Sequence, residues 1–80
     1  MKLSIHSLKG TIFDGVATKL TIPTTSGEIT VLDHHRALIS TLKKGTVHMT
    51  DQKDNMQAFA IGGGVLEVKP GNIVTVLTND

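Results

Sequence analysis

A run of three glycines, Gly62-Gly63-Gly64, is the first stretch of this sequence in which residue type and spacing could support chemistry. Glycine-rich loops bind phosphate when they lie between a strand and a helix N-terminus, whose N–H groups point at the anion. Here the glycines precede Val65-Leu66-Glu67-Val68, which is a strand pattern, and no Gly-Lys-Ser/Thr is present. We therefore predict no nucleotide site. The glycines form either a bulge or bend at a sandwich corner, or a place where another backbone approaches closely.

The four histidines are the next candidates, as metal ligands. A zinc site needs three or four ligands that converge tetrahedrally. His34 and His35 are adjacent, so in an extended backbone they point to opposite faces. His6 and His48 fall at solvent-facing positions of separate predicted strands, and no HxH or HxxxH spacing occurs. We predict surface histidines, with no metal and no cofactor.

Catalysis and nucleic-acid binding have little support in the composition. There is no cysteine and no Gly-x-Ser-x-Gly, and nothing in the sequence pairs two of the acidic residues. Only Phe13 and Phe59 are aromatic, and eight Lys+Arg stand against seven Asp+Glu, so a basic groove with stacking aromatics is not expected. We predict a protein that is not an enzyme, binds no nucleic acid and, without cysteine, forms no disulfide.

An all-β carrier domain, modified with biotin or lipoate, is an alternative from a different functional class. Such a domain would carry its modified lysine at a hairpin tip, flanked by Asp or Met. Lys43-Lys44 lies in a predicted turn, but its neighbours are Leu42 and Gly45. Mass spectrometry after expression with the appropriate ligase tests this alternative.

The elements that must position any site are short β-strands. Turn signals recur about every 8–12 residues with alternating apolar runs between them, which is typical of an all-β sandwich or small barrel. We expect a single domain, residues 1–80, folded as a small antiparallel β-sandwich of about eight to ten short strands with almost no helix. The expected strands are Lys2–Ser7, Thr11–Phe13, Val16–Ile22, Ile29–Leu32, Ala37–Leu42, Thr46–Thr50, Met56–Ile61, and one on each side of Lys69-Pro70-Gly71-Asn72.

Three local expectations can be checked against the structure. Asp14-Gly15 is predicted to end a strand, and Pro23–Gly27 to form a loop. Ala37–Leu42 is apolar enough to be buried on both faces or to be one short helical turn, and we favour a strand. In Val16–Ile22 one face is predicted to carry Val16, Thr18, Leu20 and Ile22, and the other Ala17, Lys19 and Thr21.

Size and hydropathy place the chain among partner-binding modules. No apolar run approaches the ~18–20 residues of a membrane span, and no signal peptide is recognised after Met1. Membrane association would therefore go through a partner, without direct insertion. The apolar strand surface exceeds what a small core needs, so an exposed apolar patch completed by partner proteins is expected.

The last 19 residues, GGGVLEVKPGNIVTVLTND, strongly resemble the end of the N-terminal β-sandwich of the epsilon subunit of F-type ATP synthases. That family has a Gly-Gly-x-(x)-Leu-Glu-Val run before a turn and a Val-Thr-Val-Leu strand. Ser26–Leu32 resembles its Gly-Glu loop and following strand, and Thr41–Gly45 its Leu-Lys-Pro-Gly turn. Phe13 before Gly15 and Val16 fits the start, so the resemblance spans essentially the whole sequence.

The sequence departs from that family in one loop. Asp33–Ile39 takes the place of Pro-Gly-His-Ala-Pro-Leu-Leu, and within its first five positions only His35 matches. A loop without these prolines is expected to be less rigid. The family commonly continues into a C-terminal helical hairpin that can inhibit ATP hydrolysis. The 80 residues contain no counterpart of it, so no inhibitory role is implied for them.

The resemblance implies a non-catalytic rotor subunit between the gamma subunit and the c-ring, coupling proton or sodium transport to ATP synthesis. It also implies a peripheral location on the cytoplasmic face of a membrane, or its organellar equivalent. By position, Gly27, Glu28 and Ile29 would face the polar loops of the ring, where the charge of Glu28 would steer docking. His35 and Leu42 would lie near the gamma-facing or ring-facing side.

Gly63 is the last expected contact. The missing side chain there would leave room for a neighbouring chain to approach the surface. Substituting Gly63 by Val separates the two interpretations of the glycine run. Loss of folding would favour the bend, and a folded domain that no longer binds gamma would favour the interface.

Overall fold

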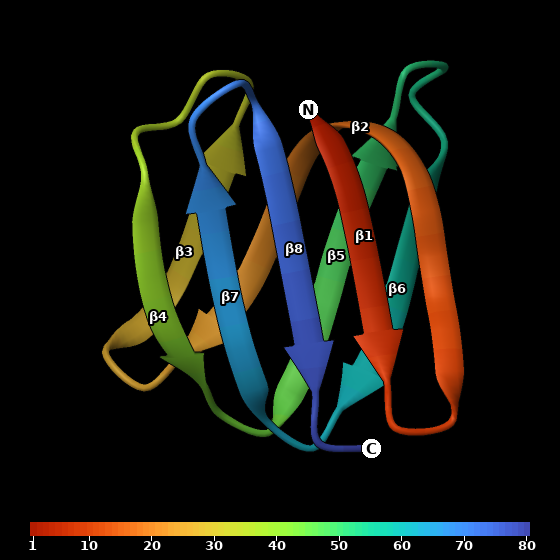
Figure 1. The fold of residues 1–80 in the computed structure, drawn as a ribbon. Helices are drawn as coiled ribbons and strands as arrows, with labels where there is room; N and C mark the ends of the chain where they lie inside the picture. Colours follow the sequence, from red (N-terminus) through yellow and green to blue (C-terminus); the bar gives the residue numbers. More distant parts are fainter.

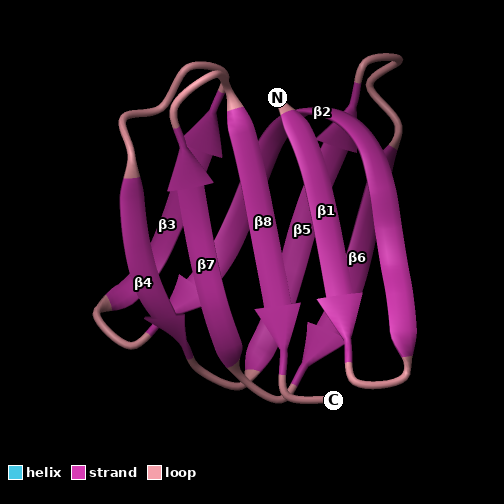
Figure 2. Cartoon of the chain, viewed as in Figure 1, coloured by secondary structure: helices cyan, strands magenta, loops and turns pink.

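A computed structural model describes all residues, 1–80. The chain forms eight strands and no helix, which confirms the predicted all-β class (Figure 2). The strands are β1 (Lys2–Ser7), β2 (Gly10–Thr24), β3 (Gly27–Leu32), β4 (Leu38–Leu42), β5 (Gly45–Asp51), β6 (Met56–Ile61), β7 (Gly64–Lys69) and β8 (Ile73–Thr78).

The strands lie in two layers that face each other across the core (Figure 1). One layer contains β4, β7, β8, β1 and the first half of β2, in that order of pairing. The other contains β3, the second half of β2, β5 and β6. The 15-residue β2 crosses from one layer to the other, so it fixes how the layers are joined. A single pair between Thr24 and Leu42 also links β2 to β4 at a corner.

The predicted antiparallel sandwich is confirmed, and a single pair of its strands departs from the antiparallel arrangement. β1 and β8 are parallel, with Leu3 opposite Val74 and Ile5 opposite Val76. Strands from the two ends of the chain can be parallel because everything between them serves as the connection. Pattern analysis does not detect such a pairing, because alternation identifies strands and not their partners.

The predicted break at Asp14-Gly15 was also wrong, since β2 continues through both residues. Gly15 lies opposite Leu3, and a Cβ there would lie 3.2 Å from the ring of Phe13. The glycine therefore admits the neighbouring aromatic ring and does not reverse the chain. β2 also runs on to Thr24, so the expected Pro23–Gly27 loop is reduced to a turn at Thr25 and Ser26.

A bulge overturns the predicted facing of residues in the middle of β2. Val16 is 46% exposed, whereas Ala17 and Leu20 are fully buried. The register against β5 shifts between Ala17 and Lys19, which inserts one residue and changes the side to which the later residues point. The alternation is regular again only for Leu20 and Ile22, both of which are buried as predicted.

The core lies between the two layers and is almost entirely aliphatic. Its largest buried side chains include Leu3, Ile5, Leu20, Met49 and Leu66. The strand predicted over Ala37–Leu42 is confirmed as Leu38–Leu42, but its burial on both faces was wrong because Ile39 is 74% exposed. No helix in the structure is long and apolar enough to cross a membrane.

Candidate partner interface

The three glycines connect β6 to β7 and lie against the end of β8. Gly64 has a φ of +146°, and a Cβ there would lie 1.9 Å from the carbonyl oxygen of Leu77, which no side chain permits. Gly63 has a φ of +125°, and its carbonyl accepts a hydrogen bond from the N–H of Asn79 at 3.0 Å. The N–H of Gly62 donates to the carboxylate of Asp80 at 2.7 Å.

This geometry accounts for the glycine run within the chain itself. Positive φ values at Gly63 and Gly64 make the bend, and the missing Cβ of Gly64 admits the backbone of β8. Both interpretations from the sequence therefore apply, with the approaching backbone belonging to the same molecule. Gly63 is buried.

Most of the predicted contact residues come together at one end of the sandwich. Thr24 pairs with both Gly27 and Leu42, and Leu42 in turn pairs with Gly64. The hydroxyl of Thr24 donates to the carbonyl of Gly27 at 2.5 Å. Glu28 follows Gly27 on β3 and is exposed. We call this end of the molecule, defined by Gly27, Glu28, Leu42 and the glycine run, the base.

His35 lies away from the base, in the connection between β3 and β4 at the other end of β3. Its N–H donates to the carbonyl of Leu32 at 3.2 Å, and its Nδ1 lies 2.8 Å from the carbonyl of Arg36. His34, with a φ of +61°, donates its N–H to the side chain of Asn72 at 2.7 Å. The loop that lacks the family's prolines is thus tied to the turn between β7 and β8.

Asp33 completes this end of the molecule. Its carboxylate accepts hydrogen bonds from the Met1 ammonium and from the Asn72 amide, the latter at 3.3 Å. These two donors, the ammonium first, hold the pKa of Asp33 below its ordinary value. The start of the chain, the connection between β3 and β4, and the turn between β7 and β8 therefore meet at the ionised side chain of Asp33.

The side chains that could do chemistry are scattered. The His6 imidazole lies 3.2 Å from the hydroxyl of Thr11, and His48 is exposed on the outer face of β5. No group of three or more His, Cys, Asp or Glu side chains is placed to hold a metal ion.

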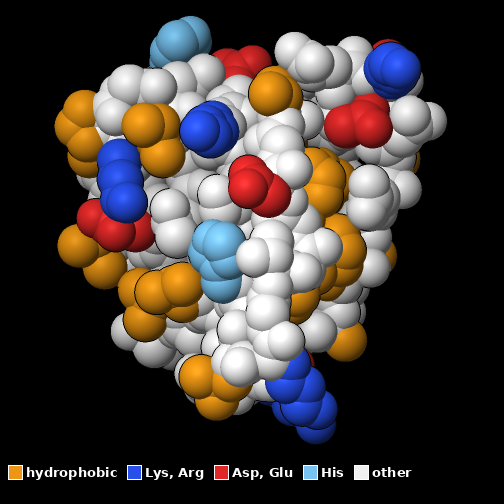
Figure 3. All heavy atoms as spheres, turned by 45° about the vertical axis from the view of Figure 1, so that its right-hand side comes forward, with side chains coloured by type: hydrophobic (Ala, Val, Ile, Leu, Met, Phe, Trp, Pro, Cys, Tyr) orange, Lys and Arg blue, Asp and Glu red, His pale blue; other side chains and the backbone are white.

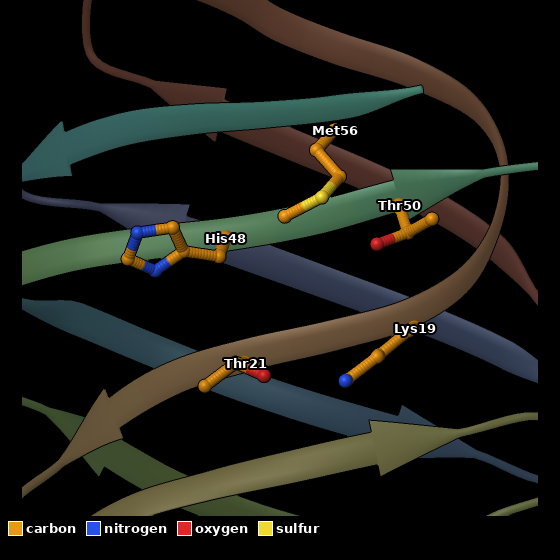
Figure 4. A pocket seen from close by; sticks show the side chains of 5 residues that line it. All are labelled: Lys19, Thr21, His48, Thr50 and Met56. Carbon is orange, nitrogen blue, oxygen red and sulfur yellow. The ribbon is translucent and has the colours of Figure 1, made fainter. Parts of the chain in front are cut away.

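A shallow hollow of about 150 Å³ lies on the outer face of β2, β5 and β6 (Figure 4). It is lined by Lys19, Thr21, His48, Thr50 and Met56. It contains no carboxylate, and the hydroxyl of Thr21 is already engaged with that of Thr30 at 3.1 Å. Activation of a hydroxyl nucleophile needs a hydrogen bond to a neighbouring base, and none joins a hydroxyl to His48 in this hollow.

The lysine pair that a carrier domain would need is not at a hairpin tip. Lys43 and Lys44 connect β4 to β5, and these two strands lie in different layers and do not pair with each other. The N–H of Lys43 donates to the carbonyl of Pro23 at 3.2 Å, which fixes the connection to the base.

The outer face of the first layer carries apolar side chains that the sequence analysis did not single out. Val65 lies between Thr41 and Leu77 in the pairing register, and it is 41% exposed while Leu77 is 52% exposed. Val65, Leu77 and Ile39 together supply exposed apolar surface of the kind that the sequence analysis expected partner proteins to cover. The alternation itself contained the signal, because Val65 and Leu77 are out of phase with the buried Leu66 and Val76.

Comparison with known proteins supplies the family. A family model described as the beta-sandwich domain of the ATP synthase Delta/Epsilon chain matches residues 1–80. The chain belongs to this family. The resemblance deduced from the sequence is thereby confirmed.

Curated members of the family extend the comparison. The ATP synthase epsilon chain of Bordetella avium (strain 197N) is 35% identical over 79 residues, which are 99% of this chain and 55% of that protein. The ATP synthase epsilon chain of Bordetella petrii shows the same identity and coverage. The chain thus spans about half the length of the curated relatives it matches.

Solved structures share the fold. A chain in the cryo-EM structure of the Euglena gracilis mitochondrial ATP synthase, OSCP/F1/c-ring in rotational state 1, superposes with a TM-score of 0.94 at 22% identity. The match covers 51% of that chain and 100% of this one. A chain in the central stalk/c-ring structure of the Tetrahymena thermophila mitochondrial ATP synthase superposes with a TM-score of 0.83 at 17% identity. The match covers 63% of that chain and 100% of this one.

Proposed function

We propose that this epsilon-family chain is a non-catalytic central-stalk subunit of an F-type ATP synthase, linking gamma to the c-ring. In this role it couples proton or sodium transport to ATP synthesis. The observation that carries the proposal is the family match over all 80 residues. Fold neighbours in F1/c-ring and central stalk/c-ring assemblies support it.

The mechanism is mechanical. Two layers joined through β2 and an aliphatic core make a compact body, and such a body transmits torque when it is bound on two surfaces. Exposed apolar side chains on both layers, such as Leu77 and Met56, support a chain that partners complete. Because those partners belong to a membrane complex, we place the chain peripherally, on the cytoplasmic face or its organellar equivalent.

We assign the base to the c-ring. Glu28 is exposed there, and its neighbours Gly27 and Ile29 are half-buried. Leu42 and Gly63 are buried beneath this surface, so they would act by holding its shape. His35, at the other end of β3, would contact a different neighbour, for which gamma is the candidate.

Co-purification with gamma and reconstitution onto the ring test the proposal. We expect Glu28→Lys to weaken assembly onto the c-ring while its melting temperature stays that of the parent, because exposed charges act on docking more than on folding. Glu67→Lys, at a half-buried position of β7 outside the base, is the matched charge reversal and should assemble onto the c-ring as the parent does. Unchanged assembly of Glu28→Lys removes Glu28 from the interface. Failure of the folded chain to bind gamma at micromolar concentration argues against the whole assignment.

A further inference from the structure

One side of the sandwich is open between two strand edges. β6 pairs with β5 alone, and the first half of β2, Gly10–Val16, pairs with β1 alone. These two segments form the right-hand margins of the two layers in Figure 1 and do not pair with each other. The backbone of β6 is therefore free along the whole side that faces away from β5.

The hydrogen-bond register identifies which groups of β6 are free. The N–H of Asp51 donates to the carbonyl of Asn55 at 2.9 Å, so this opposed pair is a hydrogen-bonded one. Hydrogen-bonded and non-hydrogen-bonded pairs alternate along an antiparallel ladder. Thr50 opposite Met56, His48 opposite Ala58 and Thr46 opposite Ala60 are consequently non-hydrogen-bonded pairs. Met56, Ala58 and Ala60 thus direct their N–H and C=O groups outward.

β6 has none of the features that protect an edge strand. Its sequence, MQAFAI, contains no charge and no proline, and Ala58 and Ala60 are exposed and small. Edge strands are normally blunted by charged residues, Pro or bulges, since a bare edge pairs with other chains. The opposite edge of the same layer, β3, carries Glu28. β6 is therefore the edge best suited to accept another strand.

Apolar side chains line the opening. Phe13 of β2 and Phe59 of β6, the only aromatic residues of the chain, pack against the core but remain partly exposed. Ile12 and Met56 alternate with these two rings and are exposed on the outer faces of the same two segments. Figure 3, which turns this side forward, shows hydrophobic side chains in a broken strip down it.

The upper end of the opening is polar. A hollow of about 410 Å³ lies between β2 and the β5–β6 turn, lined among others by Asp14, Asp51 and Lys53. The Asp51 carboxylate accepts hydrogen bonds from the N–H groups of Asn55 and Lys53, which lower its pKa and keep it ionised. Two carboxylates against one ammonium favour a cationic group at this end of any occupant.

We propose that β6 binds an extended segment of the gamma subunit by β-strand addition. The segment would be uncharged where it pairs with Met56, Ala58 and Ala60, apolar on the side that covers Phe13 and Phe59, and basic at the end beside Asp14 and Asp51. Main-chain hydrogen bonds would supply affinity and the alternating side chains specificity. The inference rests on the proposed function for the identity of the partner, and adds how and where it binds.

Hydrogen–deuterium exchange of the 80-residue chain, alone and in complex with gamma of the same organism, tests this directly. Strand addition protects backbone N–H groups, whereas side-chain packing alone does not. We expect the amides of Met56, Ala58 and Ala60 to exchange at least about tenfold more slowly in the complex, while amides already paired with β5 change little. A complex that leaves the β6 amides unprotected overturns the strand addition and leaves the rotor assignment intact.

A pair of variants at Ala58 tests the same contact by affinity. Ala58→Pro removes one outward N–H without removing a ladder bond to β5, and Ala58→Ser keeps that N–H with a side chain of similar size. We expect Ala58→Pro to bind gamma at least about tenfold more weakly than Ala58→Ser. Equal affinities of the two folded variants contradict the proposal. If Ala58→Pro does not fold, the exchange experiment, which needs no variant, decides alone.

The remaining outcomes are equally decisive. If the folded wild-type chain forms no complex with gamma, both the proposed function and the strand addition fail. If β6 becomes protected in the chain alone as its concentration rises, and sedimentation shows a dimer, the occupant is a second copy and not gamma. Protection confined to β3 or β4 in the complex would place the partner strand on the opposite side.

Discussion

At the scale of single residues, Gly64 shows how one missing Cβ fixes the local fold. Its φ of +146° is outside the range of L side chains, and the carbonyl of Leu77 occupies the place of a Cβ. We expect Gly64→Ala to lower the free energy of unfolding by more than about 3 kcal/mol, or to prevent folding, because two strands must separate to admit the methyl group. Urea unfolding measures this loss.

Gly10 provides the control for that substitution. It also has a positive φ, +135°, but nothing lies within 4 Å of its missing Cβ. Gly10→Ala therefore introduces backbone strain alone, for which a cost of roughly 1–3 kcal/mol is expected. Equal losses for the two variants would show that conformation, and not the approach of β8, makes Gly64 necessary.

Asp51 organises the turn between β5 and β6 through its ionised carboxylate. The N–H groups of Asn55 and Lys53 donate to it and lower its pKa. A lowered folded-state pKa gives stability that is present above the unfolded value, about 3.9, and is lost as the pH falls through the folded value. We expect Asp51→Ala to lower the melting temperature at pH 7 and to differ less from the parent near pH 2.

Gln52→Ala, in the same turn but without a side-chain hydrogen bond, controls for the loss of side-chain bulk. Its melting temperature should follow that of the parent at both pH values. A gap between Asp51→Ala and the parent that stays constant with pH would mean that the charge of Asp51 contributes nothing to stability.

At the scale of elements, the bulge in β2 can be tested by comparing two aliphatic residues that the sequence placed on one face. Leu20 is fully buried and Val16 is 46% exposed. We expect Leu20→Ala to cost about 2–5 kcal/mol in unfolding free energy, as core deletions do, and Val16→Ala less than about 1 kcal/mol. Chemical denaturation of both variants measures the difference. Similar costs would restore the face assignment that the bulge overturned.

The strands were predictable from the sequence because alternation and turn residues are local signals. Lys69–Asn72 is the clearest case, since Gly71 and Asn72 both have the positive φ that such a turn requires. The bulge after Ala17 and the continuity of β2 through Asp14-Gly15 were not predictable, because both depend on what β2 meets in β5 and β1.

The same limit applies to the candidate site. That Gly27, Leu42 and Gly64 adjoin one another follows from the pairing of β2 with β3 and β4, and of β4 with β7. Alternation within each strand carries no information about these partners. The resemblance to the epsilon family selected Gly27, Glu28 and Leu42, and the structure shows which of them lie at the surface of the base.

At the scale of the whole molecule, the proposed contacts at Glu28 and His35 lie at opposite ends of β3. A strand rises about 3.3 Å per residue, so the four steps from Glu28 to Leu32, onto which His35 is hydrogen-bonded, span roughly 13 Å. Sites this far apart in one rigid body with no shared partner contribute independently to binding. If the base contacts the ring and the His35 loop contacts gamma, the two contacts should therefore be separable.

A double-mutant cycle on the reconstituted rotor measures this independence. We expect Glu28→Lys and His35→Ala each to weaken assembly, and the double variant to lose the sum of the two losses within about 0.5 kcal/mol. A larger coupling energy would mean that the sandwich deforms between its ends. A torque-transmitting subunit cannot be soft in that way, because deformation of the body would absorb the rotation that it has to pass on. The cycle therefore tests whether the sandwich acts as a stiff coupling between its two neighbours.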